Sequence, residues 1–324
     1  MSRIFAFNGD ADGLCALQQL HLAECARADR LVTGPKRRIA LLEEIAAGAG
    51  DEVTVLDVSF DVNRAGVYRL LEAGARVRYF DHHYAGEIRA HPGLRAFIDP
   101  SPDVCTSLIV DRHLRGTQAA WAMVGAFGDN LDESAQRLAA ALRFSAARTQ
   151  ALRELGTALN YNAYGESERD LHFPPAELHQ RLARYQDPLA FARADPAFAR
   201  LSEGYRDDLR RAERLEPYAQ ARHAALYVLP DARWARRVGG VLASRLARRA
   251  PARAHAVVLP VSGGLQVSVR APLERPRGAA ALCRDYAGGG GREGAAGINR
   301  LPADELERFA ARFMGHFASP QLDS

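Results

Sequence analysis

The chain has 324 residues, of which 48% are hydrophobic and 25% are charged, values typical of a folded protein long enough for two domains. No apolar run reaches the length of a membrane span and the N-terminus carries no secretory signal, so we expect a cytoplasmic protein without a membrane partner. The four cysteines include no CxxC pair, which disfavours zinc and disulfides, and the net charge of +4 permits an anionic partner without establishing one.

The first part of the chain alternates short β-rich runs with helical patterns. Apolar residues at helical spacing separate runs that are rich in β-branched and aromatic residues, which predicts a parallel sheet with helices on its faces. The predicted strands are 3–7, 30–33, 52–58 and 75–81, and the predicted helices between them are 14–26 and 63–75.

The remainder of the chain is first helical and then α/β. Amphipathic patterns predict helices from about residue 105 to 220, including one long pattern over 133–159. A second α/β pattern follows, with a strand at 223–230, a helix at 234–250 and a hairpin at 254–272. We therefore predict an α/β protein in three parts, which are a parallel-sheet domain (1–150), a helical connector (151–221) and a smaller α/β domain (222–320).

The segment NGDADG, residues 8–13, directly follows the first predicted strand. Its two carboxylates, Asp10 and Asp12, repel each other unless a cation lies between them. The segment matches the start of a calcium-binding EF-hand loop, but that loop needs a preceding helix and a glutamate at its twelfth position, where this chain has Gln19. The two remaining interpretations of this segment are a solvated turn and another kind of metal site.

Further acidic residues end other predicted strands. Asp57 closes one strand, and Asp81 closes the next and is followed by His82 and His83. The carboxyl ends of parallel strands line one crevice, so these groups and the NGDADG carboxylates should converge there. Bound cations would relieve their repulsion. Aspartate together with imidazole suits Mn²⁺ better than Mg²⁺.

These motifs resemble those of the DHH phosphoesterases. The first motif of that family resembles NGDADG, the second is a strand-end aspartate such as Asp57, and the third is Asp-His-His, here 81–83. Asp129 is the best match to the fourth motif. The sequence GGGREGAAG, residues 289–297, resembles the signature of the DHH-associated domain, with Arg292 in place of histidine.

The resemblance implies two divalent cations, with Mn²⁺ preferred and Mg²⁺ as an alternative, and an active site in the cleft between the two domains. His83 would face the substrate phosphate and Asp81 would orient the histidines. The metal ligands that it implies are Asp10, Asp12, Asp57 (bridging), His82 and Asp129. Ala6 and Asn8 stand where members of the family carry further metal ligands, which predicts weaker binding of one ion.

The glycine-rich segment near the end of the chain is predicted to be a loop that binds the substrate. Glycines let backbone N–H groups approach a phosphate closely, and Arg292 could add a charge-assisted fork. Arg270, at the end of a predicted strand, is the second candidate for phosphate binding. The predicted substrate-binding residues are Arg270, Gly289, Gly290, Gly291 and Arg292. Lys36, the only lysine of the chain, fits a substrate contact and an exposed basic turn equally well.

The resemblance implies a phosphodiesterase that converts short single-stranded oligonucleotides or linear dinucleotides to nucleoside 5′-monophosphates by a two-metal mechanism. Alternatives within the enzyme class are a single-strand exonuclease, a cyclic-dinucleotide phosphodiesterase and, last, a pyrophosphatase. An alternative from another class is a nucleotide-binding regulatory protein with a weakened metal site. The oligomeric state is left open, with a homodimer among the options.

Overall fold

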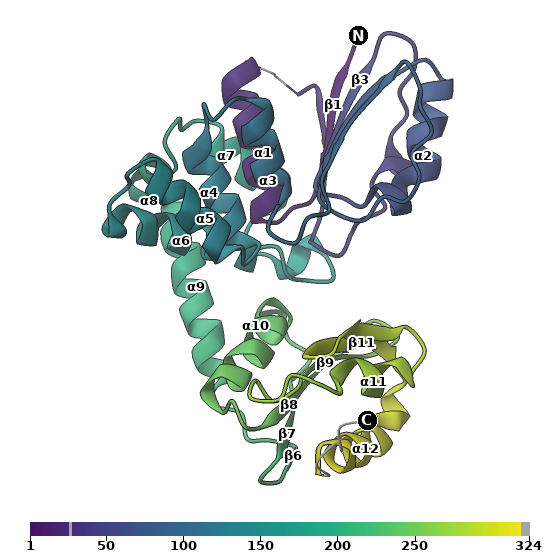
Figure 1. Cartoon of the computed structure of the whole chain (residues 1–324), viewed down its shortest axis with the longest axis vertical. Coiled ribbons are helices and arrows are strands. Elements are labelled where there is room, and N and C mark those ends of the chain that lie inside the picture. The colour runs from purple at the N-terminus through teal and green to yellow at the C-terminus, as the bar shows by residue number, and fades with distance from the viewer. Residues whose placement is uncertain (26–27, 319–324) are drawn as a thin grey trace. The chain divides into compact units, whose positions relative to one another are not determined.

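The computed structural model describes residues 1–25 and 28–318 (Figure 1). The chain divides into two compact units, Met1–Glu203 and a second unit that begins at Gly204. The first unit therefore includes residues 151–203, which the sequence analysis assigned to a connector. Within the described ranges, every helix is too short or too polar to cross a membrane.

The first unit is built around a parallel sheet that has five strands among the described residues, in the order β2-β1-β3-β4-β5. Its strands are β1 (Arg3–Phe7), β2 (Arg30–Val32), β3 (Glu52–Leu56), β4 (Arg76–Asp81) and β5 (Leu94–Ile98). Its helices are α1 (Ala11–Glu24), α2 (Phe60–Glu72), α3 (Thr106–His113), α4 (Ala119–Gly128), α5 (Asp132–Ala141), α6 (Ala146–Tyr161), α7 (Pro175–Leu182) and α8 (Pro188–Ala194). Helix α9 (Pro196–Ala212) runs from the first unit into the second.

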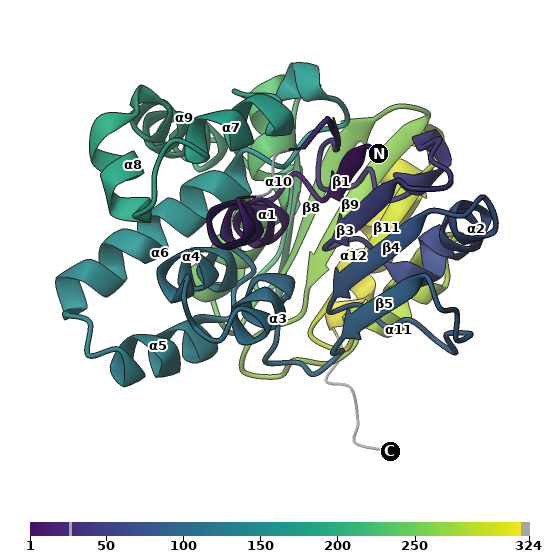
Figure 2. The ribbon, with the colours of Figure 1, turned by 90° about the horizontal axis from the view of Figure 1, so that it is seen from above.

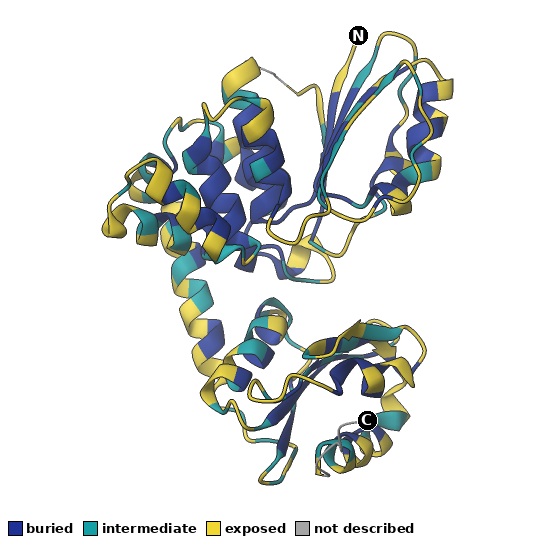
Figure 3. Ribbon diagram, in the orientation of Figure 1, coloured by how far each residue is buried: buried dark blue, intermediate teal, exposed yellow. Residues whose placement is uncertain are grey.

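The sheet of the first unit is buried on both faces. Alternate residues of each strand point to opposite faces, so Phe5 and Phe7 pack with α1, α3 and α4, whereas Ile4 and Ala6 pack with α2. Figure 2 shows α2 on one side of the strands and the larger helical group on the other, and Figure 3 shows the strands as the buried layer. This double coverage explains why the strands are apolar runs rather than alternating ones.

The predicted α/β class is confirmed, with differences in detail. Strand β5 was missed because it is a sheet edge that carries few buried apolar residues. The long helical pattern over 133–159 is two helices, α5 and α6. The chain breaks at Arg143, which has a φ of 54°, and restarts at Ser145, whose hydroxyl accepts from the Arg148 N–H at 3.2 Å. Position 26, the last residue of the helix predicted over 14–26, lies outside the described residues.

The second unit is a mixed sheet that has six strands among the described residues, in the order β10-β11-β9-β8-β7-β6. Its strands are β6 (Ala219–Gln220), β7 (Ala224–Val228), β8 (Ala254–Val261), β9 (Gly264–Arg270), β10 (Gly289–Arg292) and β11 (Ala295–Leu301). Its helices are α10 (Arg233–Arg249), α11 (Ala279–Arg284) and α12 (Leu306–Ala318). One face of the sheet packs against α11 and α12 through Leu282, Phe309 and Phe313.

The glycine-rich segment is a strand rather than the predicted loop. Gly289–Arg292 forms β10, the edge strand that pairs antiparallel with β11. Gly291 has a φ of 138°, and a Cβ there would lie 2.5 Å from the Cα of Ala296. The glycines therefore allow close pairing of the two strands. The sequence alone suggested a loop because glycine is rare inside strands.

Candidate metal centre

Three neighbouring strands of the first sheet lead into acidic segments at one edge. Strands β1, β3 and β4 are adjacent, and Asp10, Asp57 and Asp81 lie at or just beyond their carboxyl ends. All three side chains are buried. Because the strands are parallel, their carboxyl ends share one edge, and the structure brings these predicted site residues together there.

The segment NGDADG is the turn from β1 into α1. Asp10 is the N-cap of α1, and its Oδ1 accepts from the backbone N–H groups of Asp12 at 3.0 Å and Gly13 at 3.1 Å. A Cβ on Gly13 would lie 2.2 Å from the carbonyl oxygen of Asn8. Glycine is therefore required for the helix to start directly after the strand, and this turn places Asp12 in the first helical turn.

The first turn of α3 holds the carboxylate of Asp12. The backbone N–H of Thr106 donates to Asp12 Oδ2 at 2.8 Å, and that of Ser107 donates to Oδ1 at 2.7 Å. The Ser107 hydroxyl also donates to the carbonyl oxygen of Asp12 at 2.8 Å. A helix N-terminus stabilises negative charge, so α3 fixes this buried carboxylate in one orientation. Sequence reasoning missed these two residues.

Asp57 has an unusual backbone conformation, with a φ of 59° in the left-handed region. Such strain in a non-glycine residue persists where the surrounding structure enforces it, often at functional sites. Its Oδ1 accepts from the Thr106 hydroxyl at 3.1 Å and lies 3.4 Å from His82 Nε2. Burial, followed by the charges of Asp10 and Asp12, raises the pKa of Asp57 well above its ordinary value.

His82 presents one nitrogen to the acidic centre. Its Nδ1 lies 3.1 Å from the carbonyl oxygen of Val104, which can only accept, so we assign the ring proton to Nδ1. The lone pair of Nε2 then faces Asp57 at 3.4 Å and Asp129 at 3.8 Å. Asp129 follows the end of α4, and burial together with Asp12 raises its pKa from 3.8 to about 6.

Asp81 anchors the Asp-His-His segment. Its carboxylate accepts from the backbone N–H of His82 at 2.9 Å and from that of Phe60 at 3.2 Å. Its Oδ1 also lies 2.6 Å from Nδ1 of His83. This hydrogen bond raises the pKa of His83 despite the opposing effect of burial. The His83 side chain is 44% exposed, so it borders solvent while Asp81 is fully buried.

The donor atoms of the centre suit a divalent cation. Two groups of three side chains could each hold a metal ion among residues 1–25 and 28–318. The ligand atoms of Asp12, His82 and Asp129 lie within 4.8 Å of one another, and so do those of Asp57, His82 and His83. Both groups use His82, whose available donor is the single Nε2. Carboxylates with one imidazole are ligands that Mn²⁺ and Mg²⁺ accept. A cation would also offset the effects of burial and of mutual repulsion that raise the pKa values of Asp57 and Asp129.

Lys36 is a further residue of the centre that sequence reasoning did not place there. It follows the carboxyl end of β2, and its Nζ lies 2.5 Å from Asp10 Oδ2 and 3.5 Å from Asp129 Oδ1. Burial alone would lower the pKa of Lys36, but Asp10 raises it well above its ordinary value, so it is an ammonium ion. Two signals were available in the sequence, namely its strand-end position and its being the only lysine.

The predicted phosphate-binding residues lie in the second unit. Arg292 on β10 pairs with Ala295 on β11, which pairs with Arg270 on β9, so both arginines belong to one row on one face of the sheet. Arg292 is exposed, and Nε of Arg270 donates to the hydroxyl of Ser244 on α10 at 3.3 Å. The row is therefore anchored at one end and open to solvent at the other.

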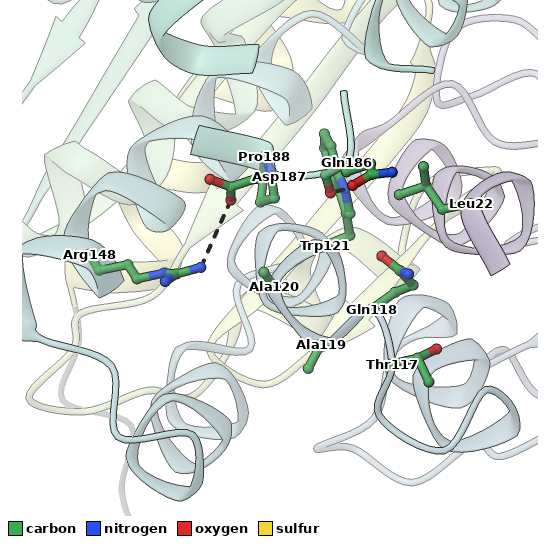
Figure 4. A pocket seen from close by; sticks show the side chains of 10 residues that line it. All are labelled: Leu22, Thr117, Gln118, Ala119, Ala120, Trp121, Arg148, Gln186, Asp187 and Pro188. Carbon is green, nitrogen blue, oxygen red and sulfur yellow. Dashed lines mark hydrogen bonds and ion pairs between the residues drawn. The ribbon is translucent and has the colours of Figure 1, made fainter. Parts of the chain in front are cut away.

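A pocket lies among the helices of the first unit (Figure 4). It is lined by Trp121, Gln186 and Leu22, among others, and Figure 4 shows the lining residues Arg148 and Asp187 pointing toward one another, at 3.9 Å. None of the predicted site residues lines it. Neither candidate group of metal-binding side chains lines this pocket; both lie at the sheet edge.

No family model matches the sequence, and neither does any curated protein. The fold is similar to that of exonuclease RecJ bound to manganese, at 19% identity and a TM-score of 0.60 over 98% of this chain and 91% of that chain. It is similar to the DHH domain of a member of the S1p family of ribosomal proteins, at 11% identity and a TM-score of 0.65 over 97% and 86%. This chain has the DHH phosphoesterase fold. A pGpG-specific phosphodiesterase from Vibrio cholerae shares the fold, at 15% identity and a TM-score of 0.57 over 99% and 100%.

The first prediction concerns the turn that places Asp12. Gly13→Ala should destabilise the protein by about 2–4 kcal/mol, because its Cβ would meet the backbone oxygen of Asn8. Gly48→Ala is the matched control in the same unit, since its Cβ would meet its nearest atom, the carbonyl oxygen of Ala73, at an ordinary 3.4 Å. Urea unfolding of both variants tests this. Equal midpoints would contradict the role assigned to Gly13.

The second prediction concerns pH and metal. The raised pKa values of Asp57 and Asp129 mean that these carboxyls take up protons on folding, so the metal-free protein loses stability as pH rises from about 4 to above 6. A divalent ion binds the deprotonated carboxylates. Mn²⁺ should therefore raise the melting temperature more at about pH 7.5 than at about pH 5.

Thermal unfolding with and without Mn²⁺ measures this difference. Asp129→Asn should reduce the shift, whereas Asp103→Asn, which changes an exposed carboxylate paired with Arg137, should not. A shift that is equal at both pH values in the unmodified protein would show that the carboxylates do not bind the ion.

Proposed function

We propose that the protein is a metal-dependent phosphodiesterase that hydrolyses short single-stranded oligonucleotides or linear dinucleotides to nucleoside 5′-monophosphates. The observation that carries the proposal is the convergence of Asp12, Asp57, His82 and Asp129 at the carboxyl edge of the parallel sheet. The DHH phosphoesterase fold adds support, since the similar structures include an exonuclease bound to manganese and a pGpG-specific phosphodiesterase.

The four converging residues would hold the divalent cation. Asp12 is fixed by the N–H groups of α3, and the assigned tautomer of His82 leaves Nε2 available. A bound divalent cation would supply Lewis acidity and lower the pKa of a coordinated water. We propose Mn²⁺ before Mg²⁺ because of the imidazole donor.

His83 is proposed to act on the substrate. Its hydrogen bond to Asp81 fixes the ring and raises its pKa, which favours the protonated form near neutrality. With Nδ1 held by Asp81, the N–H at Nε2 is the one available to donate to a phosphate oxygen or to the leaving oxygen. The ammonium group of Lys36 adds fixed positive charge to the same centre, which favours binding of an anionic substrate.

The second unit is proposed to bind the substrate's phosphate. Arg270 and Arg292 lie in one row across β9, β11 and β10, and guanidinium groups suit phosphate oxygens because they donate in a fork. The glycines of β10 allow close approach of its backbone. Each unit of the chain would thus provide one half of the function.

The third prediction tests the substrate class. Labelled RNA and DNA of about two, five and twenty nucleotides are incubated with Mn²⁺-loaded protein, and products are resolved over time. We expect the two shorter lengths to yield nucleoside 5′-monophosphates fastest, because a single phosphate-binding row holds few phosphates. Preference for the longest substrate would favour a single-strand exonuclease. No cleavage by folded, metal-loaded protein would favour a nucleotide-binding regulatory protein.

The fourth prediction concerns Asp57. Asp57→Asn removes a charged donor from the centre of the cluster while keeping its shape, and it should lower kcat by on the order of 10³. Asp61→Asn, which changes an exposed aspartate on α2 paired with Arg64, is the matched control and should leave kcat unchanged. A near-normal rate for Asp57→Asn would contradict the assignment of this residue.

The fifth prediction concerns Arg292. Arg292→Ala should mainly raise KM for a dinucleotide, because the phosphate contact is made both before and in the transition state. Arg308→Ala, an exposed arginine of α12 paired with Glu305, serves as the control in the same unit. Metal content should stay unchanged in both variants. An unaltered KM for Arg292→Ala would show that β10 serves packing alone.

A further inference from the structure

Asp10 is the carboxylate of the centre that pairs most closely with a cation. Its Oδ1 accepts the backbone N–H groups of Asp12 and Gly13, and its Oδ2 accepts the ammonium of Lys36 at 2.5 Å. Asp10 therefore already has a positive partner within hydrogen-bond distance.

Few other donors remain on this side of the centre for a second ion. Ala6 offers no ligand atom, and the side chain of Asn8 is neutral. Asn8 Oδ1 is buried without a hydrogen-bond partner, so one uncharged oxygen is what remains on this side of the centre. His82 has a single available nitrogen, and both candidate groups of donors depend on it. These donors hold one ion, whereas a second divalent ion needs several more oxygens.

The charge of Lys36 disfavours a second ion directly. A divalent ion bound to Asp10 Oδ2 at about 2.1 Å would lie within about 5 Å of the ammonium nitrogen. Like charges at that separation in a buried site repel strongly. Lys36 is itself held in place by the backbone hydrogen bond from its N–H to the carbonyl oxygen of Ala163 at 2.9 Å.

We propose that the ammonium group of Lys36 takes the place of the second divalent cation, so that this centre binds one ion through Asp12, Asp57, His82 and Asp129. Asp10 then holds the lysine instead of a metal. This inference deepens the proposed function, because it concerns the same centre, and it replaces the two ions that the resemblance implies.

Metal stoichiometry tests the proposal without any assay of activity. The full-length protein is stripped with a chelator, loaded with excess Mn²⁺ and desalted, and its manganese is counted by elemental analysis and native mass spectrometry. We expect one ion per chain. Two ions per chain, or a spin-coupled two-manganese signal in electron paramagnetic resonance, would overturn the proposal, and so would no bound ion.

Variants of Lys36 test whether this residue limits the number of manganese ions bound per chain. Lys36→Ala removes the ammonium and frees Asp10, so a second, weaker Mn²⁺ should bind. Lys36→Arg keeps the positive charge and should stay at one ion, as should Arg38→Ala, which removes the nearby arginine that pairs with Glu44. A count of one in folded Lys36→Ala would overturn the exclusion of the second ion by the lysine.

A pair of aspartate variants remains informative if Lys36→Ala does not fold. Asp10→Asn keeps an oxygen that can cap α1 and should retain one Mn²⁺, because Asp10 is not a ligand in this proposal. Asp129→Asn should lose the ion. Equal loss in both variants would make Asp10 a ligand and refute the inference. A protein with one ion and no hydrolysis would instead refute the proposed function and leave this inference standing.

Discussion

Mutual repulsion among Asp10, Asp12, Asp57 and Asp129 is the constraint on which the rest of the centre depends. Their carboxylates gather at one edge of a sheet that is buried on both faces, where charge is poorly solvated. The fold stabilises these carboxylates with hydrogen-bond donors and one cation. The donors are the backbone N–H groups at the starts of α3 and α1, and the cation is the ammonium of Lys36. These partners leave Asp57 and Asp129 with raised pKa values, and a divalent ion completes the balance.

The same constraint connects local strain to function. Asp57 has a left-handed backbone conformation, and glycine is required at position 13 because α1 begins directly after β1. Both segments place carboxylates at the same point of the sheet edge. Such features lower stability and are maintained where a bound ion restores it. A one-ion centre with a built-in ammonium would have a permanent cation, so its charge balance would depend less on the supply of metal than that of a centre with two ions.

The sequence predicted the parallel sheet and the acidic edge because strand ends and aspartates are both local features. Asp57 and Asp81 could be placed by their position after apolar runs, and parallel pairing then brings them together. Thr106 and Ser107 could not be found this way, since their contact with Asp12 joins residues far apart in the chain. The sequence left the role of Lys36 undecided, because a basic turn after an edge strand is usually solvated. The glycines of β10 were wrongly predicted to form a loop, because their pairing with β11 depends on contacts of the whole sheet.

Anomalous diffraction from crystals of the full-length protein grown with Mn²⁺ tests the central claim most directly, because it locates each manganese ion. The account predicts one anomalous peak per chain, coordinated by Asp12, Asp57, His82 and Asp129, with Lys36 Nζ still bound to Asp10. A peak on Asp10 with the lysine displaced, or a pair of peaks bridged by Asp57, would contradict it.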